Sequence, residues 1–205
     1  GDNPDAAAPL IAEHCAERGA EQNPVTQQPT CTDGRVNMEF QWSGPDVVQT
    51  RIADLLTEAY SPYFNVTRQE LLQDASITEA VTAQYNVVTW RQFGNLNPMV
   101  DNVWLMCRTI GGIALNFPRV CDEARDAELL AAQATTDEAE RAEHYRNVVQ
   151  LIHDSYAYVF LNHTLWAQAF APEVHGVCDR VSPDGVPLVC ANGGTTWHDT
   201  IWLEQ

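Results

Sequence analysis

The chain has 205 residues and a formal net charge of −17, and it contains no lysine because all 11 basic residues are arginines. Its length allows one large domain or two small ones with a full hydrophobic core. The strong negative charge argues against nucleic acid or an anionic membrane surface as a partner, since both attract basic proteins. No apolar run reaches transmembrane length, and residues 1–4 lack the basic and apolar regions of a signal peptide. We therefore expect a mature segment or a piece cut from a longer chain.

Six cysteines fall into three pairs of sequence neighbours, and each pair brackets a loop. No pair has the close Cys-x-x-Cys spacing of metal sites or redox motifs, so disulfides formed in an oxidising compartment are favoured. The alternative is a cytosolic protein with six buried thiols. Each disulfide would stabilise the fold by roughly 3 kcal/mol in the chain-entropy model. The predicted pairs are Cys15 with Cys31, Cys107 with Cys121, and Cys178 with Cys190.

Apolar periodicity and turn residues predict alternating helices and strands over the first 90 residues. A helix begins at about Asn3 and ends near Gly19, and a surface loop follows over residues 20–34. Alternation of Val36, Met38 and Phe40 with polar residues indicates a half-buried strand. The order then continues with a helix over 47–59, a strand over 63–71, a helix over 71–84 and a strand over 85–90. This order implies an α/β fold with a mostly parallel sheet flanked by helices.

One face of the helix over 47–59 carries apolar residues at three- and four-residue spacing, which predicts that this face is buried. The residues of this face are Val47, Val48, Ile52, Leu55, Leu56 and Ala59.

The segment from Tyr85 to Phe93 combines a β-branched run with large recognition-type side chains. In open α/β sheets, ligands bind beyond the carboxyl ends of such strands. The residues predicted at this rim are Trp90, Arg91, Gln92 and Phe93. The alternative is that Trp90 and Phe93 are core aromatics and Arg91 is a solvated strand end.

The second half of the sequence predicts a short helix over 99–106, a loop over 107–121 and two further helices. The loop contains Asn116, Phe117 and two glycines, so its backbone could approach a ligand closely. Asp122 can cap the first helix, and residues 135–138 form a capping box for the second. Residues 156–170 suggest one or two strands, and residues 177–191 a stapled hairpin. The predicted buried face of the second helix consists of Ala142, Tyr145, Val148, Val149 and Ile152.

Catalytic and cofactor motifs are absent from the sequence: it contains no GxSxG, no HExxH, no phosphate loop and no GxGxxG. The six histidines are scattered, and His144 and His153 lack the adjacent-turn spacing that chelates zinc. Acidic pairs at helix starts are explained by the helix macrodipole. We therefore expect that the chain is not an enzyme and that it has no metal site and no cofactor.

Several segments, taken in order, carry a resemblance to a known family. The most specific is residues 121–130, Cys-Asp-Glu-Ala-Arg-Asp-Ala-Glu-Leu-Leu, followed by residues 134–145, Ala-Thr-Thr-Asp-Glu-Ala-Glu-Arg-Ala-Glu-His-Tyr. These segments resemble the extracellular solute-binding proteins of ABC importers, in the peptide/nickel (family 5) group, and specifically their carboxyl-terminal lobe. Further matching segments are residues 3–13, 47–56, 85–90, 157–161 and 174–176.

The resemblance implies one lobe of a two-lobed clamp that delivers a small solute or peptide to an ABC permease and performs no chemistry. Residues 1–170 would be the second lobe of a periplasmic-binding-protein-like fold, and residues 171–205 a carboxyl-terminal return segment with the stapled hairpin. The family is longer, so the first lobe and half of the cleft would lie outside this chain. The implied location is the periplasm or cell surface, where a lipid anchor could hold the full-length protein. The fragment is expected to be a monomer.

By position, Trp90 resembles the family's cleft tryptophan, Asn116 lies in the asparagine-containing loop, and His163 falls where the final strand passes the cleft. Peptide binders carry an aspartate shortly after the tryptophan, whereas residues 91–95 here contain none, so a peptide's ammonium group loses that partner. The expected ligand-binding residues are Trp90, Arg91, Gln92, Phe93, Asn95, Asn116 and His163. The alternative function is a secreted protein-interaction domain whose aromatic rim docks another protein.

Overall fold

The computed structural model describes residues 3–92, 98–112, 114–163, 167–183, 185–188, 190 and 198–204. The chain forms two compact units. The first consists of Gly1–Trp90 and Gly112–Phe117, and the second of Arg91–Gly111 and Pro118–Gln205. The boundary that the sequence places between residues 170 and 171 stays a prediction.

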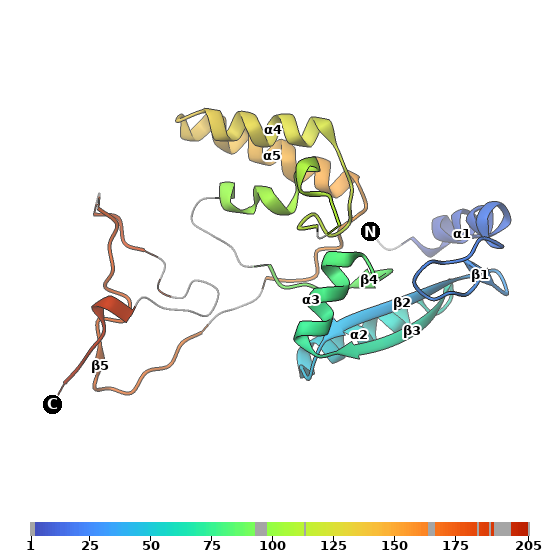
Figure 1. Ribbon diagram of the computed structural model, residues 1–205, viewed down its shortest axis with the longest axis horizontal. Helices are drawn as coiled ribbons and strands as arrows, with labels where there is room; N and C mark the ends of the chain where they lie inside the picture. The colour runs from blue at the N-terminus through green and yellow to red at the C-terminus, as the bar shows by residue number, and fades with distance from the viewer. Residues whose placement is uncertain are drawn as a thin grey trace. The chain divides into compact units, whose positions relative to one another are not determined.

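The first unit is built on a four-stranded sheet with β2 (Arg35–Ser43) at its centre (Figure 1). Along one side β2 pairs in parallel with the whole of β3 (Phe64–Leu71). Two short strands pair along the other edge of β2: β4 (Val87–Val88) in parallel and β1 (Cys31–Thr32) antiparallel. The predicted α/β fold with a mostly parallel sheet is therefore confirmed.

The strand predicted over residues 85–90 is much shorter in the structure. The side chain of Asn86, rather than its backbone, accepts the amide hydrogen of Glu39 at 3.0 Å, so the regular ladder does not extend to this residue. Backbone pairing resumes at Phe40 with Val87, and the amide of Thr89 still donates to the carbonyl of Gln41 at 3.0 Å. Trp90 thus follows immediately after the last strand contact.

Three helices accompany the sheet at the predicted positions: α1 (Pro4–Arg18), α2 (Val47–Tyr60) and α3 (Gln73–Thr82). Asn3 caps α1 and Asp46 caps α2, because each side-chain oxygen accepts first-turn amide hydrogens that have no partner within the helix. The predicted buried face of α2 is partly wrong. Ala53 is the fully buried residue of this helix, and Leu56 packs beside it, so the helix is rotated to expose four of the six predicted residues. These are Val47, Val48, Leu55 and Ala59.

Strand β2 is buried on both faces, which the alternating pattern did not predict. One face is apolar, where Phe40 and Trp42 pack with Ala53, Val66 and Val87. The other face carries Asn37 and Gln41, which are also buried although both are polar. Buried amides need hydrogen-bond partners, and this face supplies them from neighbouring side chains and loop carbonyls.

The second unit contains an antiparallel helix pair, α4 (Glu123–Ala134) and α5 (Glu138–Asp154), which lie side by side in Figure 1. Two short 3-10 helices precede it: η1 (Pro98–Trp104) and η2 (Cys107–Thr109). Asp122 caps α4 as predicted. The α5 cap is Asp137 rather than Thr135, because the Asp137 carboxylate accepts the Glu140 amide hydrogen at 2.9 Å and the Thr135 hydroxyl instead accepts the Asp137 amide hydrogen.

The core of the second unit consists of Met106, Leu129, Val148 and Ile152, with Leu105, Tyr145 and Tyr158 packed against it. Ala142 and Val149 were predicted on the buried face of α5 but both are exposed, and the exposed fraction of Val149 is 61%. Val149 shows the reason. It directly follows Val148, and a step of one residue turns a helix by about 100°, so both cannot face α4.

The rest of the second unit is mostly irregular. Residues 156–163 and 167–170 form no strand, so the strands predicted there are wrong for the described residues. Val159 and Phe160 have strand-like side chains but are exposed. A short ribbon instead pairs β5 (Val174–His175) with β6 (Trp202–Leu203), and η3 (His198–Thr200) precedes β6.

All three predicted disulfides are present: Cys15–Cys31, Cys107–Cys121 and Cys178–Cys190. The third lies over the predicted hairpin, where Val181 pairs antiparallel with Pro187. No helix among the described residues has the length and apolar character needed to cross a membrane.

Candidate functional site

The candidate site of the first unit begins where β4 ends, at Trp90. Its side chain is 38% exposed, so part of the indole faces solvent. The other part meets the Phe117 ring edge-on, with ring centroids 4.6 Å apart and an interplanar angle of 73°. Edge-to-face aromatic pairs of this kind hold each other in place while leaving a ring face open.

The segment that carries Phe117 is fixed to the first unit by backbone and burial. The Ala114 amide donates to the carbonyl of Val81, near the end of α3, at 3.0 Å. Ala114 and Asn116 are both buried. The predicted site residues Trp90 and Asn116 thus belong to the same compact unit, and Phe117 links them.

Sequence reasoning placed Phe117 in a ligand-approaching loop but did not pair it with Trp90. The signal that could have found it is the Asn-Phe-Pro triplet, which presents an aromatic residue directly beside the predicted Asn116.

The other predicted site residues belong elsewhere. Arg91, Gln92 and His163 are exposed residues of the second unit. The Gln92 side-chain amide donates to Asp101 at 3.2 Å. Phe93 and Asn95 lie outside the described residues. Binding by all seven predicted residues stays a prediction.

Two hollows are found on the surface of the described residues, one in each unit. One of about 600 Å³ runs along α5, lined mainly by Arg141, Tyr145, Arg146 and Val149. Burial raises the pKa of Tyr145, so its phenol is neutral at ordinary pH. A second of about 410 Å³ lies at the start of α2 and includes Asp46 and Glu70. Neither contains a predicted ligand-binding residue.

The described residues offer no cluster of three or more histidine, cysteine or acidic side chains that could hold a metal ion. The cysteines are all committed to disulfides. What the site around Trp90 offers is a partly exposed aromatic surface, which suits stacking on a planar or apolar group.

Comparison with known proteins gives a match in fold but none in sequence. No family model matches the chain, and no curated protein matches it. Among solved structures, a dipeptide binding protein from Pseudoalteromonas sp. SM9913, in complex with Met-Leu, matches with a TM-score of 0.62 and 20% identity. This match covers 92% of the present chain and 35% of that protein.

Two further solved structures match over a smaller part of the chain. NikA from Brucella suis, in complex with Fe(III)-EDTA, has a TM-score of 0.55 and 16% identity, and the match covers 76% of this chain and 31% of NikA. The oligopeptide-binding protein AppA from Bacillus subtilis, in complex with a nonapeptide, has a TM-score of 0.53 and 16% identity over 76% of this chain and 30% of AppA. The chain therefore has the fold of a lobe of these binding proteins and spans about a third of their length.

Proposed function

We propose that this chain is the carboxyl-terminal lobe of the substrate-binding component of an ABC importer for peptides or other small solutes. The observation that carries the proposal is the shared fold with a dipeptide binding protein over 92% of the chain. The neighbours named as binding proteins also support a role in binding rather than catalysis.

In this proposal the aromatic pair of Trp90 and Phe117 forms this lobe's contribution to a cleft. Trp90 follows the last parallel strand, where α/β sheets bind ligands, and Phe117 packs against its ring. The exposed indole face would stack on the solute, and the contact with the half-buried Phe117 would keep the indole in one orientation. Asn116, Arg91, Gln92, Phe93, Asn95 and His163 are the further proposed contacts.

The proposed solute class is a small molecule or short peptide with an apolar or planar group for the indole. Residues 91–95 contain no aspartate to receive an ammonium group, so contact with the aromatic surface, rather than a charge pair, would supply most of the binding energy.

The proposed partners are the solute, the first lobe and an ABC permease. Three disulfides support an extracytoplasmic location, and we propose a lipid anchor for the longer protein.

The test is to purify the full-length protein from its native host and to identify co-purified small molecules by mass spectrometry after denaturation. A single solute or peptide class released from the wild type, and absent from the Trp90→Ala variant, would support the proposal. Release of nothing, together with a native gene product that has no additional lobe, would contradict it.

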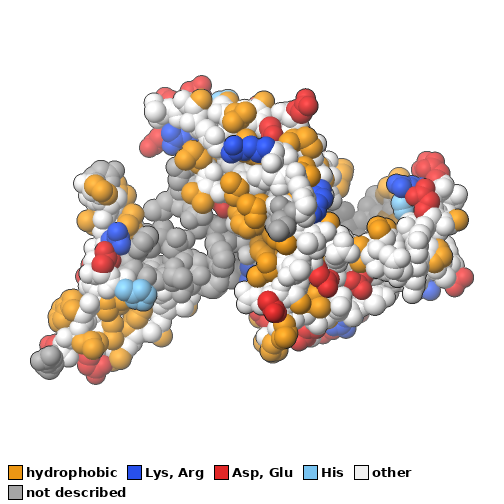
Figure 2. All heavy atoms as spheres, in the orientation of Figure 1, with side chains coloured by type: hydrophobic (Ala, Val, Ile, Leu, Met, Phe, Trp, Pro, Cys, Tyr) orange, Lys and Arg blue, Asp and Glu red, His pale blue; other side chains and the backbone are white. Residues whose placement is uncertain are grey.

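The alternative is a secreted protein-interaction domain, and one observation favours it. In Figure 2 hydrophobic side chains gather over the β5–β6 ribbon, where Trp202 and Leu203 are exposed. Exposed aromatic and aliphatic side chains of this kind occur at protein interfaces. Cross-linking of the full-length protein in its host distinguishes the two functions, because the alternative predicts a protein bound through Trp202 and no released solute.

A further inference from the structure

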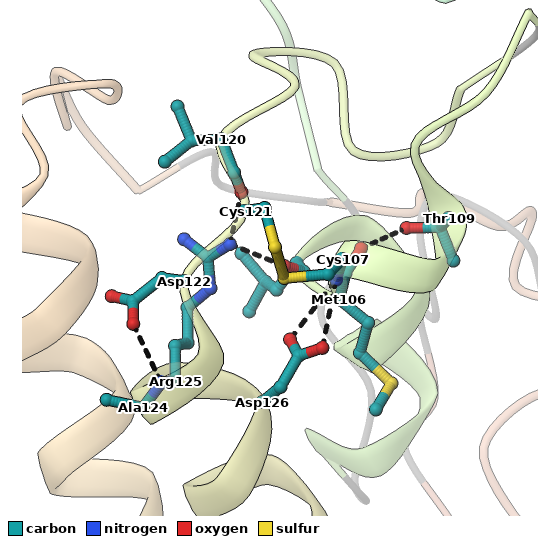
Figure 3. Close-up of a disulfide and its surroundings, with 10 residues drawn as sticks. Met106, Cys107, Thr109, Val120, Cys121, Asp122, Ala124, Arg125 and Asp126 are labelled. Atoms are coloured by element: carbon teal, nitrogen blue, oxygen red, sulfur yellow. Dashed lines mark hydrogen bonds between the residues drawn. A yellow bond between two sulfur atoms is a disulfide. The ribbon is translucent and has the colours of Figure 1, made fainter.

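The loop over residues 107–121 has a neck where its two ends meet, and Figure 3 shows this neck beside the start of α4. The Cys107–Cys121 disulfide closes the neck covalently. Cys121 is exposed and Cys107 is half-buried. The same loop carries Asn116 and Phe117.

A second, noncovalent link joins the same two stretches of backbone. The Arg125 guanidinium is only 1% exposed, and its Nη2 donates to the carbonyl of Leu105 and to the carbonyl of Val120, at 2.6 Å each (Figure 3). Leu105 lies two residues before one cysteine and Val120 lies one residue before the other. Hydrogen bonds from a buried charged donor are stronger than neutral ones, so a single side chain ties the two ends together.

The adjacent residue of α4 holds the neck from a second direction. Both carboxylate oxygens of Asp126 accept the backbone amide hydrogen of Cys107, at 3.1 and 3.2 Å. The first turn that presents Arg125 and Asp126 is itself fixed, because the Asp122 carboxylate caps it through the amides of Ala124 and Arg125. None of these contacts involves a sulfur atom.

We propose that Arg125, assisted by Asp126, closes the neck of this loop in the folded chain whether or not Cys107 and Cys121 are oxidised. The disulfide then adds a covalent bond to a neck that the buried guanidinium has already closed. This follows from the geometry, since the guanidinium bridges both backbone segments without using either cysteine. The inference does not depend on solute binding.

The closed neck also favours formation of the disulfide, for which glutathione disulfide serves as the oxidant. The thiolate of one cysteine attacks glutathione disulfide, forms a mixed disulfide and releases one glutathione thiolate. The thiolate of the second cysteine then displaces the second glutathione. Two protein thiols are oxidised and one glutathione disulfide is reduced to two thiols. Holding the cysteines together raises their effective concentration in the second step.

The first experiment measures hydrogen exchange of the amide at position 107 in the full chain. In the double variant Cys107→Ser with Cys121→Ser, this amide should keep its wild-type protection. In the oxidised Arg125→Met variant, its exchange should be at least about tenfold faster, since the bridge to the neck is lost. Arg108→Met is the matched control, because Arg108 lies in the same loop and is exposed.

Loss of protection in the double serine variant, with Arg125 intact, would overturn the proposal by showing that the disulfide alone closes the neck. This variant leaves Arg125 and Asp126 in place, so it tests the noncovalent closure of the neck even if circular dichroism shows that Arg125→Met does not fold.

The second experiment equilibrates the protein with mixtures of reduced and oxidised glutathione and quantifies the Cys107–Cys121 pair by alkylation and peptide mass spectrometry. The Arg125→Met variant should form this disulfide with an equilibrium constant about tenfold lower than wild type, a difference of roughly the strength of one charge-assisted hydrogen bond. Arg108→Met should match wild type. Equal constants in all three proteins would contradict a role for Arg125 in bringing the cysteines together.

Discussion

The side-chain amide nitrogen of Gln41 lies 2.6 Å from a carboxylate oxygen of Glu79, although Gln41 is in the central strand and is 0% exposed. The same nitrogen is 2.6 Å from a carboxylate oxygen of Glu39 and 3.1 Å from the carbonyl of Gln84. The two hydrogens of one buried amide are therefore shared among two carboxylates and a loop carbonyl, and this amide connects β2 to α3 and to the segment before β4.

Replacing Gln41 by Leu should lower the free energy of unfolding of the first unit by about 2–4 kcal/mol, because two partly buried carboxylates lose their shared donor. Urea unfolding followed by tryptophan fluorescence measures the change, since Trp42 is in the same strand. Gln133→Leu is the matched control at an exposed position of α4 and should change stability by less than about 0.5 kcal/mol. An unchanged or raised stability of the Gln41 variant would show that the cluster is not stabilising.

The neighbours Leu129 and Leu130 test the orientation of α4. Leu129 is 0% exposed in the core with Met106 and Val148, whereas Leu130 is 53% exposed. Leu129→Ala should therefore destabilise the second unit by about 2–5 kcal/mol, and Leu130→Ala by less than about 1 kcal/mol. Thermal unfolding of both variants by circular dichroism measures the difference. Equal losses would mean that α4 is not packed in the orientation described.

The contact between Glu128 of α4 and His144 of α5 makes part of the stability of the second unit depend on pH in the acid range. The hydrogen bond from His144, at 2.7 Å, and then that from Asn147, hold the pKa of the Glu128 carboxyl below its ordinary value of 4.5. Because the folded pKa lies below the unfolded one, the unfolded state binds more protons between the two values. The stabilisation is therefore present above about pH 4.5 and is lost as the pH falls through the folded pKa.

Glu128→Gln removes this titration, so its stability should fall less steeply than that of wild type between about pH 5 and pH 3. Glu173→Gln, at an exposed position of the same unit, should follow the wild-type curve. Urea midpoints measured across this range give both curves. A Glu128→Gln curve parallel to wild type would show that the contact with His144 does not contribute to stability.

Local signals in the sequence predicted much of the fold. The Asp122 cap, the three disulfides, and the positions of α1, α2, α3 and β3 follow from residue type and spacing, which act over a few residues. At the candidate site, the sequence predicted that Trp90 follows a parallel strand and is partly exposed, and the structure agrees on both points, whereas ligand binding there stays a prediction. These features can be predicted without knowing which residues pack against them.

Features that depend on distant partners were missed. Gln41 is a polar position of an alternating strand and Arg125 a charged helix residue, and neither position signals burial from the sequence alone. Both are buried because acceptors 20 or more residues away satisfy part of their hydrogen bonding. The exposure of Val47 depends on which face of α2 meets the sheet. Residues 156–163 have strand-like composition, but a strand also requires a neighbouring strand, which composition does not encode. The ring contact between Trp90 and Phe117 joins segments 27 residues apart.

The isolated chain should bind solute weakly or not at all, because a cleft between lobes buries its ligand only when both lobes are present. Calorimetric titration with short peptides, sugars and nickel is expected to be flat. The chain spans about a third of the length of the binding proteins that share its fold. Micromolar or tighter binding by this chain alone would contradict the two-lobe proposal.

The exposure of Trp90 makes its contributions to stability and to binding separable. The edge contact with Phe117 stabilises the folded unit by only about 1 kcal/mol, so Trp90→Ala should change the melting temperature little. Truncation of an aromatic side chain at a well-packed ligand contact typically costs about 2 kcal/mol or more, which corresponds to at least tenfold weaker solute binding by the full-length protein.

Two other tryptophans are matched controls for that experiment, which combines thermal unfolding with calorimetric titration. Trp42 is a buried core residue, so Trp42→Ala should cost about 3–5 kcal/mol of stability. Trp202 is exposed on the β5–β6 ribbon of the second unit, and Trp202→Ala should leave solute affinity unchanged. If Trp90→Ala instead loses stability as Trp42→Ala does and keeps its solute affinity, Trp90 is a core residue. The binding surface would then have to be sought at Asn116 and His163.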